Sequence, residues 1–420
     1  MARVHFVLVL AVAIALSIIT NTVNPLADEI PPILSKTDIF DFSVENELFY
    51  DDSIKDKVTF TSEGLELEQG ATRGILTSEV ITANIPFSDV GVHWKAELPP
   101  GTEILIKIRT SKENNEWTSW QQVSVESYPN QNRKEEFFSS LIGIEQKDRT
   151  HNFIQYRVTL ISRDKGISPT LARICFTFID AGVTPPSFLE KIKHYGRKNN
   201  LEAHFFAQYA SYPKPSIVSR AGWGCNESLM TWPPQYEPVT HIIIHHTATP
   251  NTDTDWAARV RSIYYYHAVT KGWGDIGYNY LVDPNGVLYE GRYGGDDVIG
   301  AHAYGYNDGT MGLAFLGTYS NTSPSSVMLN SAEELLAWKC DHRSIDPLGS
   351  GPDNDGAVYP YICGHRDVAN TECPGDKLYN LLPTIRQNVQ NLISGEQLTV
   401  YDFWRKDDPI YADPSSSCSN

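Results

Sequence analysis

Apolar and polar residues alternate along several short segments between residues 58 and 181, which is the pattern of strands that bury one face. Gly, Pro and Asn separate these segments, and no segment of helical periodicity and comparable strength interrupts them. The pattern therefore predicts an antiparallel, all-β sandwich as the first folded domain. The clearest of the predicted strands are 90–98, 103–109, 153–161 and 174–179.

The pattern changes after residue 217, where apolar strand-like runs alternate with helical segments. Three consecutive isoleucines, 242–244, are β-branched and predict a buried strand within 240–249. A turn cluster at 283–286 predicts a hairpin over 278–291. Residues 218–396 are therefore expected to form a mixed α/β domain, with a central β-sheet flanked by helices. The other predicted elements are a strand at 311–319, a helix from Asp253 or Thr254 to about 267, a helix capped by Ser331 and ending near 343, and a helix over 374–393.

The remaining segments are predicted to flank or connect these two domains. Residues 1–27 have a short polar start and an apolar run over 6–19, which is shorter than the ~20 residues that span a bilayer and is typical of a signal peptide. The protein is therefore expected to be exported, to the cell envelope or beyond, with no stable membrane insertion after cleavage; an uncleaved anchor is the alternative. We expect a linker or edge segment at 28–57, a linker that is partly helical near 187–194 at 182–217, and a polar tail at 397–420.

The charge balance narrows the class of partner. The formal net charge is −17, which argues against nucleic acid because phosphate contacts need a basic surface.

In the first domain, Trp94, Trp117 and Trp120 either form a platform for glycan contact or belong to the core.

Two segments far apart in the chain carry candidate metal ligands. His245 lies at the end of the predicted strand, and His365 and Cys373 lie in the Gly-interrupted loop 363–375. Zinc binds imidazole nitrogen and thiolate sulfur readily, and a catalytic zinc site uses three protein ligands with one open position. We therefore predict that these three residues bind Zn²⁺. The alternative is that the histidines form ordinary hydrogen bonds and the cysteine is only a buried apolar residue.

Six sequence elements together resemble the family of peptidoglycan recognition proteins and type 2 N-acetylmuramoyl-L-alanine amidases. They occur in family order between about residues 219 and 392, which is under half of the chain. The elements are Ile243-Ile-His-His-Thr247, Asp275-Ile-Gly-Tyr-Asn-Tyr280, Val287-Leu-Tyr-Glu-Gly-Arg292, Gly300-Ala-His302, Gly312-Leu-Ala-Phe-Leu-Gly317, and Gly364-His-Arg-Asp367 with Cys373-Pro-Gly375.

The resemblance implies a zinc amidase that hydrolyses the bond between the lactyl group of N-acetylmuramic acid and L-alanine in peptidoglycan. It implies that Tyr278 is catalytic, with its hydroxyl directed at the oxyanion or the attacking water, and that Thr371 has a secondary stabilising role. All three ligand positions and the tyrosine are filled here, which favours an enzyme. A peptidoglycan-binding receptor or anchor with little hydrolytic activity is the alternative.

The resemblance also implies a set of substrate contacts. Gly272, Trp273 and Arg292 occupy positions that accompany a preference for meso-diaminopimelate stems, whose extra carboxylate a guanidinium can pair with bidentately. The other residues expected to contact the muropeptide are His246, Thr247, His267, His302, Tyr304 and Asn307.

The chain contains six cysteines, and disulfides persist in exported proteins. If Cys373 binds zinc, five cysteines remain, so at most two disulfides can form. One expectation is a disulfide between Cys225 and Cys340, although spacing alone does not determine connectivity.

Overall fold

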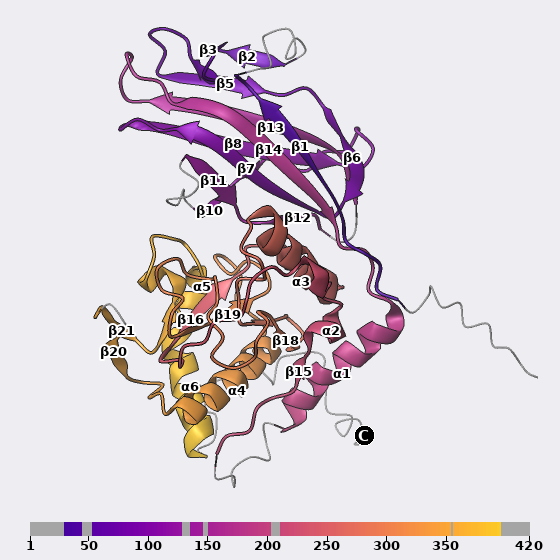
Figure 1. Cartoon of the computed structure of the whole chain (residues 1–420), viewed down its shortest axis with the longest axis vertical. Coiled ribbons are helices and arrows are strands. Elements are labelled where there is room, and N and C mark those ends of the chain that lie inside the picture. Colours follow the sequence, from indigo (N-terminus) through magenta and orange to yellow (C-terminus); the bar gives the residue numbers. More distant parts are fainter. Residues whose placement is uncertain are drawn as a thin grey trace, which may run out of the picture.

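The computed structural model describes residues 29–43, 53–127, 135–145, 150–202, 211–353 and 356–395. The predicted signal peptide and the predicted C-terminal tail lie outside these residues. Figure 1 shows a β-rich region, coloured indigo to magenta, that lies against a mixed α/β region, coloured pink to yellow. Within the described residues, no helix has the length and apolar character needed to cross a membrane.

The β-rich region consists of two antiparallel sheets whose inner faces share one hydrophobic core. The first sheet has the order β10-β11-β7-β14-β4-β3, with β1 on β14 and β12 on β7, and the second has the order β2-β5-β13-β8-β9, with β6 on β13. The shared core includes Phe176 and Phe178 of the first sheet and Tyr156 and Val158 of the second. The strands are β1 (Leu34–Asp41), β2 (Ile54–Asp56), β3 (Val58–Phe60), β4 (Leu65–Leu67), β5 (Arg73–Thr77), β6 (Ile81–Phe87), β7 (Asp89–Glu97), β8 (Thr102–Ser111), β9 (Gln121–Gln122), β10 (Val125–Ser127), β11 (Glu136–Ser139), β12 (Ile142–Gly143), β13 (His151–Ser162) and β14 (Thr170–Asp180).

The tryptophans of this region divide between its core and its surface. Trp94 is buried and stacks on Phe137 with ring centroids 5.6 Å apart, so it is a core residue. Trp117 and Trp120 are half-buried, and the guanidinium of Arg109 lies 4.8 Å from the centroid of each ring. The rings of Trp117 and Trp120 therefore each form a cation–π contact with Arg109.

The mixed region is built around a six-stranded sheet with the order β15-β18-β17-β19-β16-β22. Its pairs are parallel except for the β17–β18 hairpin. The strands are β15 (Ile217–Val218), β16 (His241–His246), β17 (Tyr280–Val282), β18 (Leu288–Glu290), β19 (Thr310–Phe315) and β22 (Ile362–Gly364), with β20 (Ser350–Pro352) and β21 (Val358–Pro360) in a separate hairpin. The helices are α1 (Pro186–Glu202), α2 (Arg220–Trp223), η3 (Glu227–Leu229), α3 (Trp256–Tyr265), the π-helical turn η4 (Tyr266–Thr270), α4 (Ser326–Arg343), η5 (His365–Asp367), α5 (Asp376–Tyr379) and α6 (Leu382–Ser394).

Alternating side chains of β19 separate two cores on the two faces of this sheet. Leu313 and Phe315 pack with α4 and α6, whereas Ala314 packs with α3, because successive side chains of a strand point to opposite faces. Cys340 belongs to the first core and Cys225 packs against the second. Both are free cysteines, and the predicted disulfide between them is wrong because the sheet separates them.

Several predicted element boundaries also need correction. Helix α4 begins earlier than predicted, because Ser325 caps it by accepting a hydrogen bond from Met328 N, and Ser331 is buried within the helix. The predicted helix over 374–393 is divided into α5 and α6, and the Cys373–Pro374 peptide bond is cis. Segment 28–57 contains β1, which pairs with β14 along its whole length.

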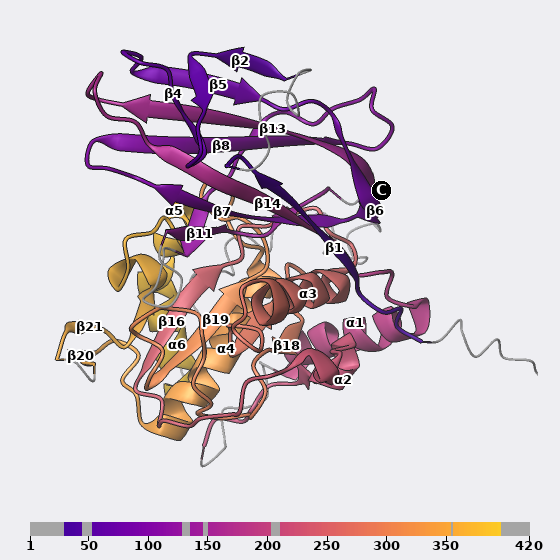
Figure 2. The ribbon, with the colours of Figure 1, turned by 45° about the horizontal axis from the view of Figure 1, so that its top comes forward.

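The two regions meet along α3 and η4, and Figures 1 and 2 show α3 directly beneath the β-rich sheets. Leu141 and Ile179 of the β-rich region share a core cluster with α3. The Tyr266 hydroxyl of η4 donates a hydrogen bond to the carbonyl of Ser139 over 2.9 Å. A side chain at Gly91 would collide with the Tyr266 ring, so glycine is required there for close approach.

Candidate metal centre

The three predicted metal ligands come together from two neighbouring parallel strands and the loop that follows one of them. His245 lies near the end of β16, His365 begins η5 directly after β22, and Cys373 follows in the same loop. One potential ligand atom from each residue lies within 4.8 Å of the other two. The parallel β16–β22 pairing explains this convergence, because the carboxyl ends of parallel strands meet at one edge of a sheet.

Hydrogen bonds determine which nitrogen of His245 faces the cysteine. The hydroxyl of Thr310 is directed at the carbonyl of Tyr306, 2.6 Å away, so its oxygen accepts from His302 Nε2 at 3.3 Å. His302 Nδ1 is then an acceptor and receives the Nε2–H of His245 at 3.0 Å. The lone pair of His245 therefore lies on Nδ1, which is 3.7 Å from Cys373 Sγ.

Burial keeps the candidate ligands in their neutral forms at neutral pH. It lowers the pKa of His365 to about 4 and that of His245 well below its ordinary value. Burial also raises the pKa of the Cys373 thiol to about 12, partly opposed by a hydrogen bond from the backbone N–H of His246 over 3.3 Å. Two neutral imidazoles and one thiol that loses its proton on binding are a donor set suited to zinc.

Tyr278 lies beside this cluster. Its ring centroid is 5.4 Å from that of His245 and 5.5 Å from that of His267. Burial raises the pKa of Tyr278 well above its ordinary value. The phenol is therefore protonated at neutral pH and can act as a hydrogen-bond donor.

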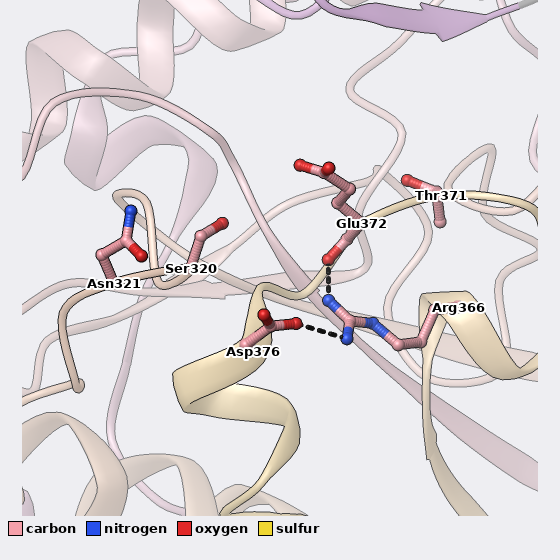
Figure 3. Close-up of a pocket in the computed structure, with 6 residues that line it drawn as sticks. All are labelled: Ser320, Asn321, Arg366, Thr371, Glu372 and Asp376. Atoms are coloured by element: carbon pink, nitrogen blue, oxygen red, sulfur yellow. Dashed lines mark hydrogen bonds and ion pairs between the residues drawn. The ribbon is translucent and has the colours of Figure 1, made fainter.

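Thr371 lines a polar pocket of about 400 Å³ next to Cys373 (Figure 3). Its hydroxyl accepts a hydrogen bond from the Cys373 backbone N–H over 3.2 Å, so it supports the loop that carries the cysteine. Arg366 pairs with Asp376 over 2.7 Å at one side of the pocket, and Ser320 lies across from it. Arg366 belongs to the motif Gly364-His-Arg-Asp367, which predicted a role for His365 only, and no motif of the sequence includes Ser320.

Of the residues predicted to accompany a diaminopimelate preference, Trp273 is half-buried and Arg292 is fully buried. The ring of Trp273 packs on His267 with centroids 4.6 Å apart, next to Gly272, which has a φ of +70°. The Arg292 side chain is buried at 1% exposure, and its guanidinium lies 4.7 Å from the centroid of Trp232. Arg292 Nη1 donates a hydrogen bond over 3.2 Å to the carbonyl of Ile276, the residue before Gly277, whose N–H bonds to His267.

Of the other residues predicted to contact the muropeptide, some are held by hydrogen bonds inside the protein and one is exposed. Thr247 is buried and bonds to Thr249 over 2.8 Å, and Asn307 Oδ1 accepts from the backbone N–H of His302 over 2.8 Å. His246 Nδ1 faces the backbone N–H of Tyr319 at 3.2 Å. Tyr304, in contrast, is 81% exposed. His302, as described above, lies behind His245.

Two charged residues near the site were not predicted. Lys271 of the mixed region is buried and pairs over 2.7 Å with Glu126 of the β-rich region. No sequence motif relates these residues, because they belong to different regions and are 145 positions apart.

Sequence comparison relates residues 235–376 and their surroundings to known proteins. The N-acetylmuramoyl-L-alanine amidase family (Amidase_2) matches residues 235–376. Peptidoglycan-recognition protein SC2 of Drosophila simulans is 34% identical over 171 residues, which are 40% of this chain and 85% of that protein. Peptidoglycan recognition protein 1 of Bos taurus is 33% identical over 175 residues, covering 40% of this chain and 82% of that protein.

Two further relatives complete the comparison. The N-acetylmuramoyl-L-alanine amidase of Homo sapiens is 36% identical over 176 residues, which are 40% of this chain and 28% of that protein. A solved structure of Drosophila PGRP-LB has 32% identity, covers 39% of this chain and 91% of that chain, and has a TM-score of 0.33. On the sequence matches, the chain belongs to the family of peptidoglycan recognition proteins and N-acetylmuramoyl-L-alanine amidases.

Proposed function

We propose that this protein is an exported zinc amidase that hydrolyses the lactyl–L-alanine amide bond of peptidoglycan. The observation that carries the proposal is the convergence of His245, His365 and Cys373 beside Tyr278. The family contains both amidases and proteins named for recognition, so membership alone does not decide between hydrolysis and binding. A complete set of ligands together with a donor phenol favours hydrolysis.

The roles of the residues follow from their positions. His245 Nδ1, His365 and Cys373 Sγ would hold the metal, which when bound lowers the pKa of water and polarises a carbonyl. Tyr278 keeps its proton at neutral pH and donates it in a hydrogen bond to the developing oxyanion. Thr371 holds the backbone of the Cys373 loop, which keeps the thiolate in place.

The two regions have separate proposed roles in this reading. Residues 218–396 form the amidase domain, and residues 58–181 form an accessory β-sandwich, supported by the core that the two sheets share. For contact with glycan, the half-buried Trp117 and Trp120 are the remaining aromatic candidates, since Trp94 belongs to the core.

We further propose a preference for meso-diaminopimelate stems. Support comes from Trp273, which packs on His267, and from Arg292, which bonds to the carbonyl of Ile276 next to Gly277, a hydrogen-bond partner of His267. Arg292 is buried, so its expected contribution is its charge: Arg292→Met keeps the apolar stem and removes the cation, and the ratio of kcat/KM for diaminopimelate over lysine stems should fall. An unchanged ratio would remove this part of the proposal.

The amidase proposal is tested by mass spectrometry of muropeptides incubated with the mature protein, with and without a chelator. Release of stem peptides that begin with L-alanine, lost on chelation and in Cys373→Ser, is the expected result. Tyr278→Phe should lower kcat about 10²-fold while muropeptide binding is retained, as loss of one oxyanion donor does elsewhere.

A binding-only protein is the second candidate, favoured by the relatives that are named as recognition proteins. Tight binding of muropeptides by zinc-loaded protein, without any released stem peptide, would place this function first.

A further inference from the structure

Strand β10, at the end of the first sheet's strand order, brings Glu126 of the β-rich region against the mixed region beside Tyr278 and His267. Glu126 Oε2 lies 2.7 Å from Lys271 Nζ, and Oε1 lies 3.8 Å from His267 Nε2. The side chains of Lys271 and His267 are 1% and 4% exposed, whereas that of Glu126 is 24% exposed. Among the described residues, Glu126 provides the only carboxylate within 4.0 Å of this ammonium.

The second contact of Glu126 orients an imidazole that touches Tyr278. His267 Nδ1 accepts the backbone N–H of Gly277 over 3.2 Å, so its proton lies on Nε2, the nitrogen that faces Glu126. The same ring packs against Trp273 at 4.6 Å and against Tyr278 at 5.5 Å between centroids. The imidazole of His267 therefore lies between the Glu126 carboxylate and Tyr278, the proposed oxyanion donor.

Lys271, the ion-pair partner of Glu126, also packs against the rings of Trp273 and Tyr266. Its ammonium lies 4.4 Å from the centroid of Trp273 and 5.1 Å from that of Tyr266. Removal of the carboxylate would leave a buried cation without a counter-charge, which is costly, so Lys271 would move and disturb the rings that it covers.

The interface holds Glu126 in register with these partners. Ser139, the acceptor for the Tyr266 hydroxyl, lies on β11 and pairs directly with Val125, the neighbour of Glu126 on β10. One hydrogen bond therefore ties η4 to the strand pair that carries the carboxylate.

We propose that Glu126 is a positioning residue of the amidase site, so that the β-rich region completes the site. This inference rests on the proposed function, because His267, one partner of Glu126, lies beside Tyr278 of the proposed amidase site. Glu126 acts through His267 and Lys271 and does not itself touch the reacting bond.

The test uses the full chain in a double-mutant cycle on muropeptide hydrolysis. Glu126→Gln should lower kcat/KM on the order of 10-fold, within the range expected for coupled neighbours. Adding Lys271→Met should restore most of this loss, because it removes the unpaired cation while keeping the apolar stem. The matched control is Glu136→Gln, which removes a carboxylate that pairs with Arg173 inside the β-rich region over 2.7 Å and should leave kcat/KM unchanged.

A second readout separates this inference from the amidase proposal. The ¹⁵N NMR signals of His267, assigned with His267→Gln, should change in Glu126→Gln and remain the same in Glu136→Gln. If wild-type protein releases no stem peptide, the amidase proposal fails, and the NMR comparison still decides whether Glu126 orients His267. Additive effects of the two substitutions together with unchanged His267 signals would overturn the inference.

Discussion

His302 decides which nitrogen of His245 is available to a metal ion. Thr310 orients His302, and His302 accepts the Nε2 proton of His245, so Nδ1 is left to bind. Gly312 leaves the space that this arrangement needs, since a side chain there would collide with the His302 ring. Outer partners of this kind fix the tautomer of a metal-binding histidine and raise its basicity.

The first prediction follows from this relay. His302→Ala should weaken zinc affinity about 10- to 100-fold, because His245 loses the acceptor that fixes its tautomer. Competition with a zinc chelator measures the affinity. Replacement of the exposed His194 by Ala is the control, and equal affinities for the two variants would contradict the relay.

At the scale of elements, β16 carries both residues of a hydrophobic core and the candidate ligand His245. Ile242 and Ile244 pack with α4 and α6, and the alternate positions carry His241, Ile243 and His245. The apolar run and its strand were predictable, because β-branched residues and burial specify a strand locally. The start of α4 was predicted wrongly, because Ser325 and Ser331 are both acceptable caps by composition and only packing distinguishes them.

The second prediction concerns the dependence of stability on pH. Burial lowers the pKa of His241 below its ordinary value of 6.5, so the folded state favours the neutral ring. The unfolded chain takes up a proton near its ordinary pKa, so the stabilising contribution is present above about pH 6.5 and is lost as the pH falls below it.

Urea unfolding midpoints between pH 7.5 and pH 5 provide the measurement. The midpoint of the wild type should fall with decreasing pH more steeply than that of His241→Gln. The exposed His194, replaced by Gln, should leave the wild-type slope unchanged, and a parallel slope for His241→Gln would refute the prediction.

At the scale of the whole molecule, a buried polar contact joins the two regions. Asp89 of β7 accepts a hydrogen bond from Ser262 over 2.7 Å and forms an ion pair with Arg259, both in α3. Leu141 and Ile179 place apolar surface around this contact. Regions joined by a shared core are expected to unfold together.

The third prediction is a single calorimetric transition for the wild type that separates into two in Asp89→Ala. Asp89→Ala removes the contacts with Ser262 and Arg259 across the interface, whereas Arg259 keeps its pair with Asp253 inside the mixed region, so the substitution weakens the interface in particular. Asp38→Ala, which removes an exposed contact with Asn84 within the β-rich region, should retain the single transition. Two transitions in the wild type would show that the regions unfold independently.

The sequence by itself determined the mixed α/β class of the second region, the β-rich character of the first, the family and the strand that carries His245, because local periodicity and family motifs contain this information. It also supplied His245, His365, Cys373 and Tyr278 as candidates for the proposed site. Only the tertiary structure decided that His302 orients His245, that Arg292 is buried, and that Glu126 reaches Lys271. The physical reason is that these contacts join residues distant in the chain, and their partners are chosen by how sheets and helices pack. A carboxylate such as Glu126 has no local pattern that distinguishes it from a surface charge, so its role depends on the face against which β10 lies.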